Sequence, residues 1–364
     1  MIDLGIGQTE NCLFSSEEVK CSALKVINHS NNEAFQYAPE EGLYRLRVEI
    51  AKWLTNKTKM EVLYKDILIT NGASHALELI LKMMVPKGGT IIIEDPTYFF
   101  ALEIFKDWDL NIITVGLTDG GIDVGEIEKI CKKRKIDLVY TIPFNHNPTG
   151  ITANKKTINK LKMLADKFDF YVASDEVYRF VGDPQPQSMY TGHEQRIFSI
   201  GSFSKILGPG FRLGWINASD QNISDLVKCG VLISGGGVSP LMSLILSNML
   251  ETGKVDSICK KLNYFYDERR ERLIDVFSKN LPIHVKFYPP TGGFFAWLEI
   301  DSEISIDKIR ENLIEKSVDI INGSQFSLNK NFSNCLRLGF TFYPPSQLEY
   351  ACKEICLAIK KVNI

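Results

Sequence analysis

The 364-residue sequence lacks the long apolar runs and the leader-like start that mark membrane and secreted proteins. No stretch approaches the roughly 18 consecutive apolar residues of a membrane-spanning helix, and residues 1–7 have neither a charged start nor a long apolar run. A large excess of charge of one sign is also absent. The formal net charge is -2, which excludes a general attraction to nucleic acids or anionic membranes. These absences predict a cytoplasmic protein without a nucleic-acid or membrane partner.

Closely spaced cysteines are lacking as well. The eight cysteines are scattered through the chain, and none belongs to a CxxC pair or to a cluster with metal-ligand spacing. Free thiols in a reducing compartment account for such a distribution. We therefore expect no disulfide framework and no metal site.

What the sequence does contain is a regular alternation of short apolar runs and helical patterns. The expected strands are 67–70, 90–94, 111–115, 137–142, 170–174 and 196–200, and the expected helices are 74–84, 97–106, 123–135 and 154–168. This alternation predicts an α/β fold whose large domain has a mostly parallel sheet sandwiched by helices. In such sheets, ligands bind beyond the carboxyl ends of the strands.

A different pattern begins with a long helical segment near Lys254. It predicts a smaller α+β domain, with strands near 285–287, 293–300 and 334–341 and helices near 306–316 and 345–361. Residues 2–7 look extended and would close this domain. The expected division is an N-terminal segment 1–40 packing with the small domain, a large domain 41–255 and a small domain 256–364.

Lys205 is the most informative single residue, because it follows two hydroxyl residues, Ser202 and Ser204, in the stretch 201–212. A lysine amine attacks carbonyls only when deprotonated, so burial or nearby positive charge such as that of Arg212 must lower its pKa from about 10.4. Ser202, Ser204 and Arg212 could also hold a phosphate. A Schiff-base lysine beside a phosphate site suggests pyridoxal phosphate. The local sequence alone leaves a solvated loop lysine equally open.

Other polar residues follow expected strands. The amides of Ala73 and Ser74 would open a helix and could cradle a phosphate, although a plain cap by Asn71 or Ser74 is the alternative. Asp175 could pair with a pyridine nitrogen and keep it protonated, or it could cap a helix. Asn147 precedes a proline and could bind a phenolate oxygen, or simply mark a turn.

Three motifs together resemble a known enzyme family. Asn147-Pro148-Thr149-Gly150, Ser174-Asp175-Glu176-Val177-Tyr178 and Ser202-Phe203-Ser204-Lys205, in this order and spacing, resemble the signature of fold-type I pyridoxal-phosphate enzymes, specifically class I/II aminotransferases. The resemblance covers almost the entire chain. The spacing from Lys205 to Arg212 is similar to that in the branch of kynurenine/2-aminoadipate aminotransferases and MocR aminotransferase-like domains. The resemblance implies a large sheet of the seven-stranded type. It also implies a cytoplasmic homodimer that takes part in amino acid metabolism, including biosynthetic processes.

The resemblance also implies a role for each matching residue. Lys205 would bind the cofactor covalently and move a proton between the substrate Cα and the cofactor C4′, with Asp175 on the ring nitrogen and Tyr178 as the third catalytic residue. Asn147 and Tyr178 would bind the phenolic oxygen. The phosphate would be held by Ala73, Ser74, Ser202, Ser204 and Arg212.

Further implied roles concern the substrate and the neighbouring subunit. Tyr98 would stack on the cofactor ring. Arg337 would bind the substrate α-carboxylate, assisted by Asn147 and the backbone at Gly7. Tyr37 would reach the phosphate in the neighbouring subunit, which makes the expected active unit a homodimer.

These roles predict an aminotransferase that moves an amino group between an α-amino acid and a 2-oxo acid, with 2-oxoglutarate as one acceptor, by a ping-pong mechanism. A carbon-sulfur β-lyase or related elimination enzyme is a second hypothesis, because it would share the same Lys, Asp, Tyr and Asn set. A third hypothesis is a non-catalytic effector domain of the MocR type. The short stretch before Leu4 argues against it, because it has no room for a DNA-binding domain. The sequence does not choose the preferred side chain or the acceptor.

Overall fold

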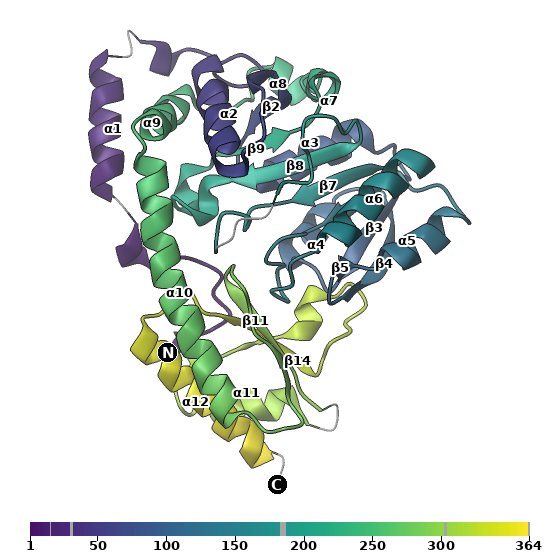
Figure 1. Cartoon of the computed structure of the whole chain (residues 1–364), viewed down its shortest axis with the longest axis vertical. Coiled ribbons are helices and arrows are strands. Elements are labelled where there is room, and N and C mark those ends of the chain that lie inside the picture. Colours follow the sequence, from purple (N-terminus) through teal and green to yellow (C-terminus); the bar gives the residue numbers. More distant parts are fainter. Residues whose placement is uncertain (15, 30–31, 183–186, 302–303, 363–364) are drawn as a thin grey trace.

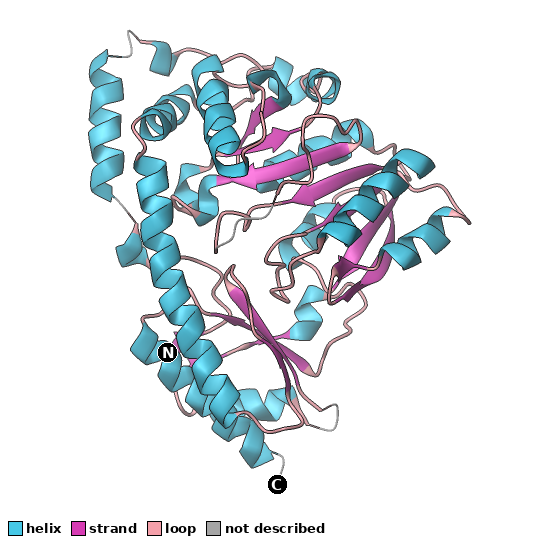
Figure 2. Ribbon diagram, viewed as in Figure 1, coloured by secondary structure: helices cyan, strands magenta, loops and turns pink. Residues whose placement is uncertain are grey.

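The computed structural model describes residues 1–14, 16–29, 32–182, 187–301 and 304–362. Within this range the chain forms two parts, which helix α10 (Lys254–Asn280) connects (Figure 1). The larger part is built on an eight-stranded sheet, and the smaller part on a four-stranded sheet (Figure 2). The predicted α/β architecture with a second, smaller α+β part is therefore confirmed.

The strand order of the large sheet is β2-β9-β8-β7-β6-β3-β4-β5. Neighbouring strands from β4 through β3, β6 and β7 to β8 run parallel, whereas β9 and the two-residue β5 run antiparallel to their neighbours. The bounds are β2 Ile67–Thr70, β3 Thr90–Asp95, β4 Asn111–Thr118, β5 Gly121–Ile122, β6 Leu138–Thr141, β7 Tyr171–Asp175, β8 Ile197–Ser202 and β9 Gly214–Asn217. Strands β5 and β9 are additions to the strands expected from the sequence.

Helices cover both faces of this sheet, because the strand side chains alternate between two separate cores. Leu138, Tyr140 and Ala173 pack in the core beneath α3 (Ala73–Met84), α4 (Phe99–Lys106) and α7 (Asp220–Leu226). Val139 and Val172, which point the other way, pack against α5 (Val124–Cys131) and α6 (Lys155–Phe168).

The smaller part is antiparallel, with strand order β10-β11-β14-β13. These strands are β10 Lys286–Tyr288, β11 Phe295–Glu299, β13 Ile321–Asn322 and β14 Cys335–Gly339, and the helices are α11 Ile306–Ile314 and α12 Pro345–Val362. β1 (Ile2–Asp3) pairs with β12 (Val318–Asp319), so the chain start joins this part as an extended segment.

The rest of the N-terminal segment takes another course. Helix α1 (Ser16–His29) packs along α9 (Pro240–Glu251), which also packs against α2 (Tyr44–Thr58) (Figure 1). The short α8 is Gly230–Ile233. The one fully buried residue of α1 is Ser22, so the apolar stripe of α1 is weak, which explains why the sequence pattern did not reveal this helix. The segment 1–40 thus contacts both parts of the chain.

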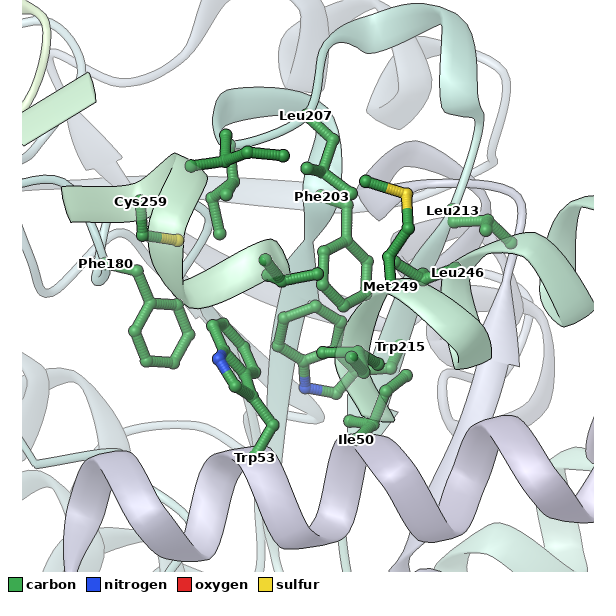
Figure 3. Packing of buried hydrophobic residues seen from close by; sticks show 14 of the residues in the cluster. Ile50, Trp53, Phe180, Phe203, Leu207, Leu213, Trp215, Leu246, Met249 and Cys259 are labelled. Carbon is green, nitrogen blue, oxygen red and sulfur yellow. The ribbon is translucent and has the colours of Figure 1, made fainter. Parts of the chain in front are cut away.

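An aromatic cluster lies under the turn that carries Lys205 (Figure 3). Ring centroids are 4.5 Å apart for Trp53 and Phe180, and 4.9 Å apart for Phe203 and Trp215. Phe203 opens the short 3-10 turn Phe203–Lys205, so burial of its ring anchors the lysine to the core. A second 3-10 turn, Pro209–Phe211, follows, where the sequence predicted a constrained loop without a helix.

Candidate active site

A cavity of about 160 Å³ opens at the carboxyl ends of β7 and β8, beside the start of α3. Ten residues predicted for the site line it, together with Ile142, Val177 and Pro209. These ten are Ala73, Ser74, Tyr98, Asn147, Asp175, Tyr178, Ser202, Ser204, Lys205 and Arg212. The fold therefore brings together residues that are up to 139 positions apart (212 minus 73).

The remaining predicted residues lie elsewhere. Gly7 and Arg337 line an adjoining cavity of about 330 Å³, which shares Lys205 and Tyr98 with the first. Tyr37 lines neither cavity; its side chain is 86% exposed and lies against Gly235 of its own chain.

One end of the first cavity carries hydrogen-bond donors and positive charge. Helix α3 begins at Ala73 after the N-cap Gly72, which has φ 81° and offers no side-chain cap, so neither Asn71 nor Ser74 caps it. Its first amides consequently lack intrahelical acceptors. The guanidinium of Arg212 lies over Gly72, where a Cβ atom would be 3.0 Å from Nη2. The hydroxyl of Ser202 lies 3.0 Å from that of Ser204. This donor set fits a phosphate.

Lys205 lies between the two cavities. Its Nζ donates a hydrogen bond to the carbonyl of Gly7 at 3.2 Å and lies 5.2 Å from the ring centroid of Tyr178. Burial lowers the pKa of Lys205 to about 8, with Arg337 acting in the same direction and Asp175 opposing. The nearby positive charge that assists is thus Arg337 and not Arg212, which is held by the carbonyl of Asn71 at 3.0 Å instead.

Asp175 ends β7 with its carboxylate buried in the cavity wall. Burial raises the pKa of Asp175 to about 6, whereas hydrogen bonds from Tyr140 and from the Val177 amide favour its ionised form. The Val177 amide donates at 3.3 Å, so the carboxylate also supports the turn that follows the strand. A buried carboxylate of this kind fits a protonated ring nitrogen.

Arg337 is the main cation of the second cavity. Its Nη1 donates to the side-chain oxygen of Asn147 at 3.1 Å and its Nη2 to the carbonyl of Gly5 at 2.5 Å, while its buried Nε has no hydrogen-bond partner in the part of the chain that the structure describes. Phe295 and Phe326 stack on the guanidinium, whose carbon lies 4.2 and 4.6 Å from their centroids. Among the described residues, no carboxylate forms an ion pair with it. Among the described residues, the buried guanidinium is therefore in contact with no carboxylate, which fits the capture of an anion.

Asn147 and Tyr178 complete the wall between the cavities. The side-chain amide of Asn147 donates to the hydroxyl of Tyr178 at 3.5 Å. Burial raises the pKa of Tyr178 far above its ordinary value, and burial likewise raises the pKa of Tyr98 to about 12, so both phenols keep their protons near neutral pH. Asn147 and Tyr178 are thus two neutral hydrogen-bond donors, which suit an oxygen anion on a flat ring.

Two histidines that adjoin motif residues support the walls. The ring of buried His146 lies between Glu94 (Nε2 to Oε2, 3.2 Å) and the hydroxyl of Thr149 (2.8 Å). His75 accepts a hydrogen bond from the Asn71 amide at 3.0 Å. Neither histidine lines the two cavities.

Three contributors are absent from the predicted site residues: Tyr140, Gly5 and Phe326. Tyr140 lies within an expected strand, but only the strand register places it beside Asp175. Gly5 acts through its carbonyl, which no side-chain pattern reveals. Phe326 comes from a 3-10 turn (Gly323–Phe326) that the sequence did not signal.

Taken together, the cavity has a phosphate-binding end, a flat wall with Tyr98, a carboxylate for a protonated ring nitrogen and a buried amine, which fits pyridoxal phosphate. Within the described part of the chain, no group of three or more His, Cys, Asp or Glu side chains is placed to hold a metal ion. In the same residues, no helix is both long and apolar enough to cross a membrane.

Comparison with known proteins agrees with this geometry. A profile of the family described as "Aminotransferase class I and II" matches residues 1–355. The chain is 30% identical over 347 residues to Aromatic-amino-acid aminotransferase 1 of Thermococcus litoralis, covering 93% of this chain and 82% of the relative. It is similar to the solved multiple substrate aminotransferase of Thermococcus profundus, with TM-score 0.92 and 27% identity over 100% of this chain and 92% of the other. A kynurenine aminotransferase of Pyrococcus horikoshii, solved in complex with PMP, KYN and KYA, has TM-score 0.90 and 28% identity over 99% and 91% of the two chains.

Proposed function

The chain belongs to the class I and II aminotransferase family, whose members depend on pyridoxal phosphate, and we propose that its preferred amino donors are amino acids with aromatic or large apolar side chains. The enzyme transfers the amino group from an α-amino acid to a 2-oxo acid. 2-Oxoglutarate is the proposed acceptor. Neither the lyase nor the effector hypothesis is favoured by the family assignment.

The residues of the first cavity hold the cofactor in this proposal. Arg212, Ser202, Ser204 and the first amides of α3 bind its phosphate, with Ala73 and Ser74 contributing the amides. Asp175 binds the ring nitrogen, Asn147 and Tyr178 bind the phenolic oxygen, and Tyr98 packs on the ring. When bound, pyridoxal phosphate supplies a protonated ring that delocalises the electron pair left on the substrate Cα.

Lys205 and Arg337 act on the substrate. Arg337 binds the α-carboxylate through its guanidinium, whose Nε has no hydrogen-bond partner among the described residues, beside Asn147 and the backbone at Gly7. Lys205, with its pKa lowered to about 8, is partly unprotonated near neutral pH and so can take the proton from the substrate Cα. Fixing both groups in one buried site is the contribution of the protein to catalysis.

The lining of the second cavity supports the proposed donor class. Its wall carries five aromatic side chains: Tyr98, Phe99, Phe100, Tyr178 and Phe295. Among the described lining residues, Lys205 and Arg337 are the cations, and both already have a role at the substrate Cα and its carboxylate. The carboxylate of aspartate, which a single methylene group holds close to the Cα, would therefore lie in an aromatic pocket without a charged partner, which is costly. The second methylene group of 2-oxoglutarate carries its distal carboxylate farther from this position. An aromatic side chain gains buried apolar contacts instead.

Kinetic comparison of amino donors tests this proposal. With 2-oxoglutarate as acceptor, we expect kcat/KM for phenylalanine and tyrosine to exceed that for aspartate by at least about 100-fold, since burying an unpaired charge costs several kcal/mol. Release of pyruvate and ammonia from cysteine conjugates serves as the control for elimination. A preference for aspartate would contradict the proposed donor class, and elimination faster than transfer would contradict the transferase function.

A homodimer forms the second part of the proposal. Tyr37 is highly exposed and lines neither cavity of its own chain, as expected for a residue that completes the site of a neighbouring subunit. All eight cysteines are free, which supports a reducing, cytoplasmic location. A role in amino acid biosynthesis belongs to this proposal because a transaminase reaction is reversible in principle.

A further inference from the structure

Tyr140 lies on the central strand β6, behind the cavity wall. The strand register pairs Tyr140 with Ala173 on β7, and side chains two positions apart on a strand share a face. Asp175 is therefore on the same face as Tyr140 and diagonal to it, within reach of a long side chain. The contact follows from the sheet and needs no loop to create it.

The hydroxyl of Tyr140 donates a hydrogen bond to Oδ2 of Asp175 at 2.9 Å. The tyrosine is completely buried and the aspartate is 7% exposed, so water does not replace this donor. Among the described residues, this is the hydroxyl's one hydrogen bond. The tyrosine ring is held from the other side by Phe105, with centroids 5.4 Å apart at 74°.

Tyr140 does not line the cofactor cavity, whereas Asp175 does. Any influence of Tyr140 on the cofactor must therefore pass through the carboxylate. A hydrogen bond to a buried carboxylate favours its ionised form over its protonated form. Of the other charged groups around Asp175, Lys205 also favours the ionised carboxylate, whereas Glu176 disfavours it. Burial disfavours the ionised form as well.

We propose that Tyr140 is a positioning residue that holds Asp175 ionised and oriented toward the ring nitrogen of the bound cofactor. The proton between these two groups then lies on the ring nitrogen rather than on the carboxylate. Without the hydroxyl, the carboxylate keeps only the longer hydrogen bond from the Val177 amide, at 3.3 Å. The protonated, neutral form of Asp175 then becomes more populated. The inference rests on the proposed placement of the cofactor with its ring nitrogen at Asp175.

The test places pyridoxal phosphate labelled with ¹⁵N at the ring nitrogen in the wild-type protein and in Tyr140→Phe. The ¹⁵N chemical shift reports directly whether this nitrogen carries a proton, whatever the catalytic activity. Because a hydrogen bond to a charged group is worth about one pKa unit or more, the ratio of protonated to unprotonated nitrogen should fall about tenfold in Tyr140→Phe. Coincident signals in the two proteins would overturn the proposal.

Two controls separate this role from simple packing. Tyr171→Phe removes a hydroxyl at the other end of β7, where the ring packs on Phe198 at 5.5 Å, and should leave the ¹⁵N signal at the wild-type position. If Tyr140→Phe does not fold, Tyr140→4-fluorophenylalanine fills the same space without a donor and should give the same change. A ¹⁵N change of equal size in Tyr171→Phe would overturn the proposal.

A double-mutant cycle gives an independent readout through the cofactor dissociation constant, followed by quenching of tryptophan fluorescence. Tyr140→Phe should weaken cofactor binding several-fold in the wild-type background and leave it unchanged in Asp175→Asn. Equal weakening in both backgrounds would mean that Tyr140 only fills space. A wild-type protein that binds no cofactor at all would refute the proposed function itself, a result distinct from either outcome of the cycle.

Discussion

At the scale of single residues, two buried cations divide the work of the site. Lys205 loses part of its basicity because it is buried, with Arg337 adding to the effect, whereas Arg337 keeps its charge, since burial lowers its pKa only to about 10. An amine that can be neutral and a guanidinium that stays charged are suited to a proton transfer and to carboxylate binding, respectively.

Replacing Arg337 by lysine tests this division. Arg337→Lys keeps one positive charge but removes the planar fork, so kcat/KM should fall about 10- to 100-fold, consistent with the ~1.5–3 kcal/mol of a charge-assisted hydrogen bond. Cofactor affinity should stay within about twofold, because Arg337 is outside the cofactor cavity. Arg212→Lys is the matched control. It should weaken cofactor binding and leave kcat/KM nearly unchanged once the cofactor is bound. The division would be wrong if Arg337→Lys weakened cofactor binding as strongly as Arg212→Lys.

How much of the site the sequence could predict depends on how each residue acts. Asp175 ends a strand, and Lys205 and Asn147 follow strand ends, so local patterns indicate their place at this edge of the sheet. Tyr140 needs the pairing of two strands that are far apart in sequence, and Gly5 acts by its backbone. For the lowered pKa of Lys205, the sequence suggests burial or a nearby charge such as that of Arg212. Burial is the main cause, but the assisting charge is Arg337, which approaches from the other part of the chain and is far from Lys205 in sequence.

At the scale of elements, strands β8 and β9 fix the turn that carries Lys205. Their register pairs Gly201 with Trp215, and the indole occupies the space where a side chain at 201 would be. The small residue at 201 is thus a packing requirement of the aromatic cluster shown in Figure 3. The sequence predicts β8 but not β9, which becomes recognisable only through its pairing with β2 and β8.

Gly201→Ala should therefore disturb both packing and the site. The added Cβ would lie 2.1 Å from Cε2 and Cζ2 of Trp215, so the free energy of unfolding should fall by about 1–3 kcal/mol. Gly210→Ala is the control, because its Cβ would meet no atom within 4 Å. Thermal unfolding of the two variants measures the difference. Equal melting temperatures would show that the sheet tolerates the methyl group and that this packing does not constrain the turn.

At the scale of the whole molecule, the second cavity draws on both parts of the chain. Lys205 follows β8 of the large sheet. Arg337 lies on β14 of the small sheet, and Gly7 follows β1. The alternation of strands and helices was sufficient to predict the α/β architecture. It could not place α1, whose contacts with α9 are not encoded by a strong apolar stripe of its own.

The proposed homodimer predicts an assembly of about twice the 41.2 kDa of one chain in sedimentation experiments. Tyr37→Phe should weaken cofactor binding about tenfold if the hydroxyl bonds the phosphate of a neighbouring subunit. Mixing Tyr37→Phe chains with Lys205→Ala chains should restore one tight site per heterodimer, since each supplies what the other lacks. Tyr44→Phe, another exposed tyrosine, serves as control. A monomeric protein, or no effect of Tyr37→Phe, would contradict this arrangement.

The most direct test of the central claim asks whether Lys205 captures the cofactor. The purified protein is mixed with pyridoxal phosphate across a pH series, reduced with borohydride, digested and mapped by mass spectrometry, with Lys205→Ala in parallel. Because the pKa of Lys205 is lowered to about 8, labelling of its peptide should rise with pH, reach half its maximum near pH 8 and then level off, while ordinary lysines label only at higher pH. Labelling at other lysines alone, or an unchanged pattern in Lys205→Ala, would contradict the account.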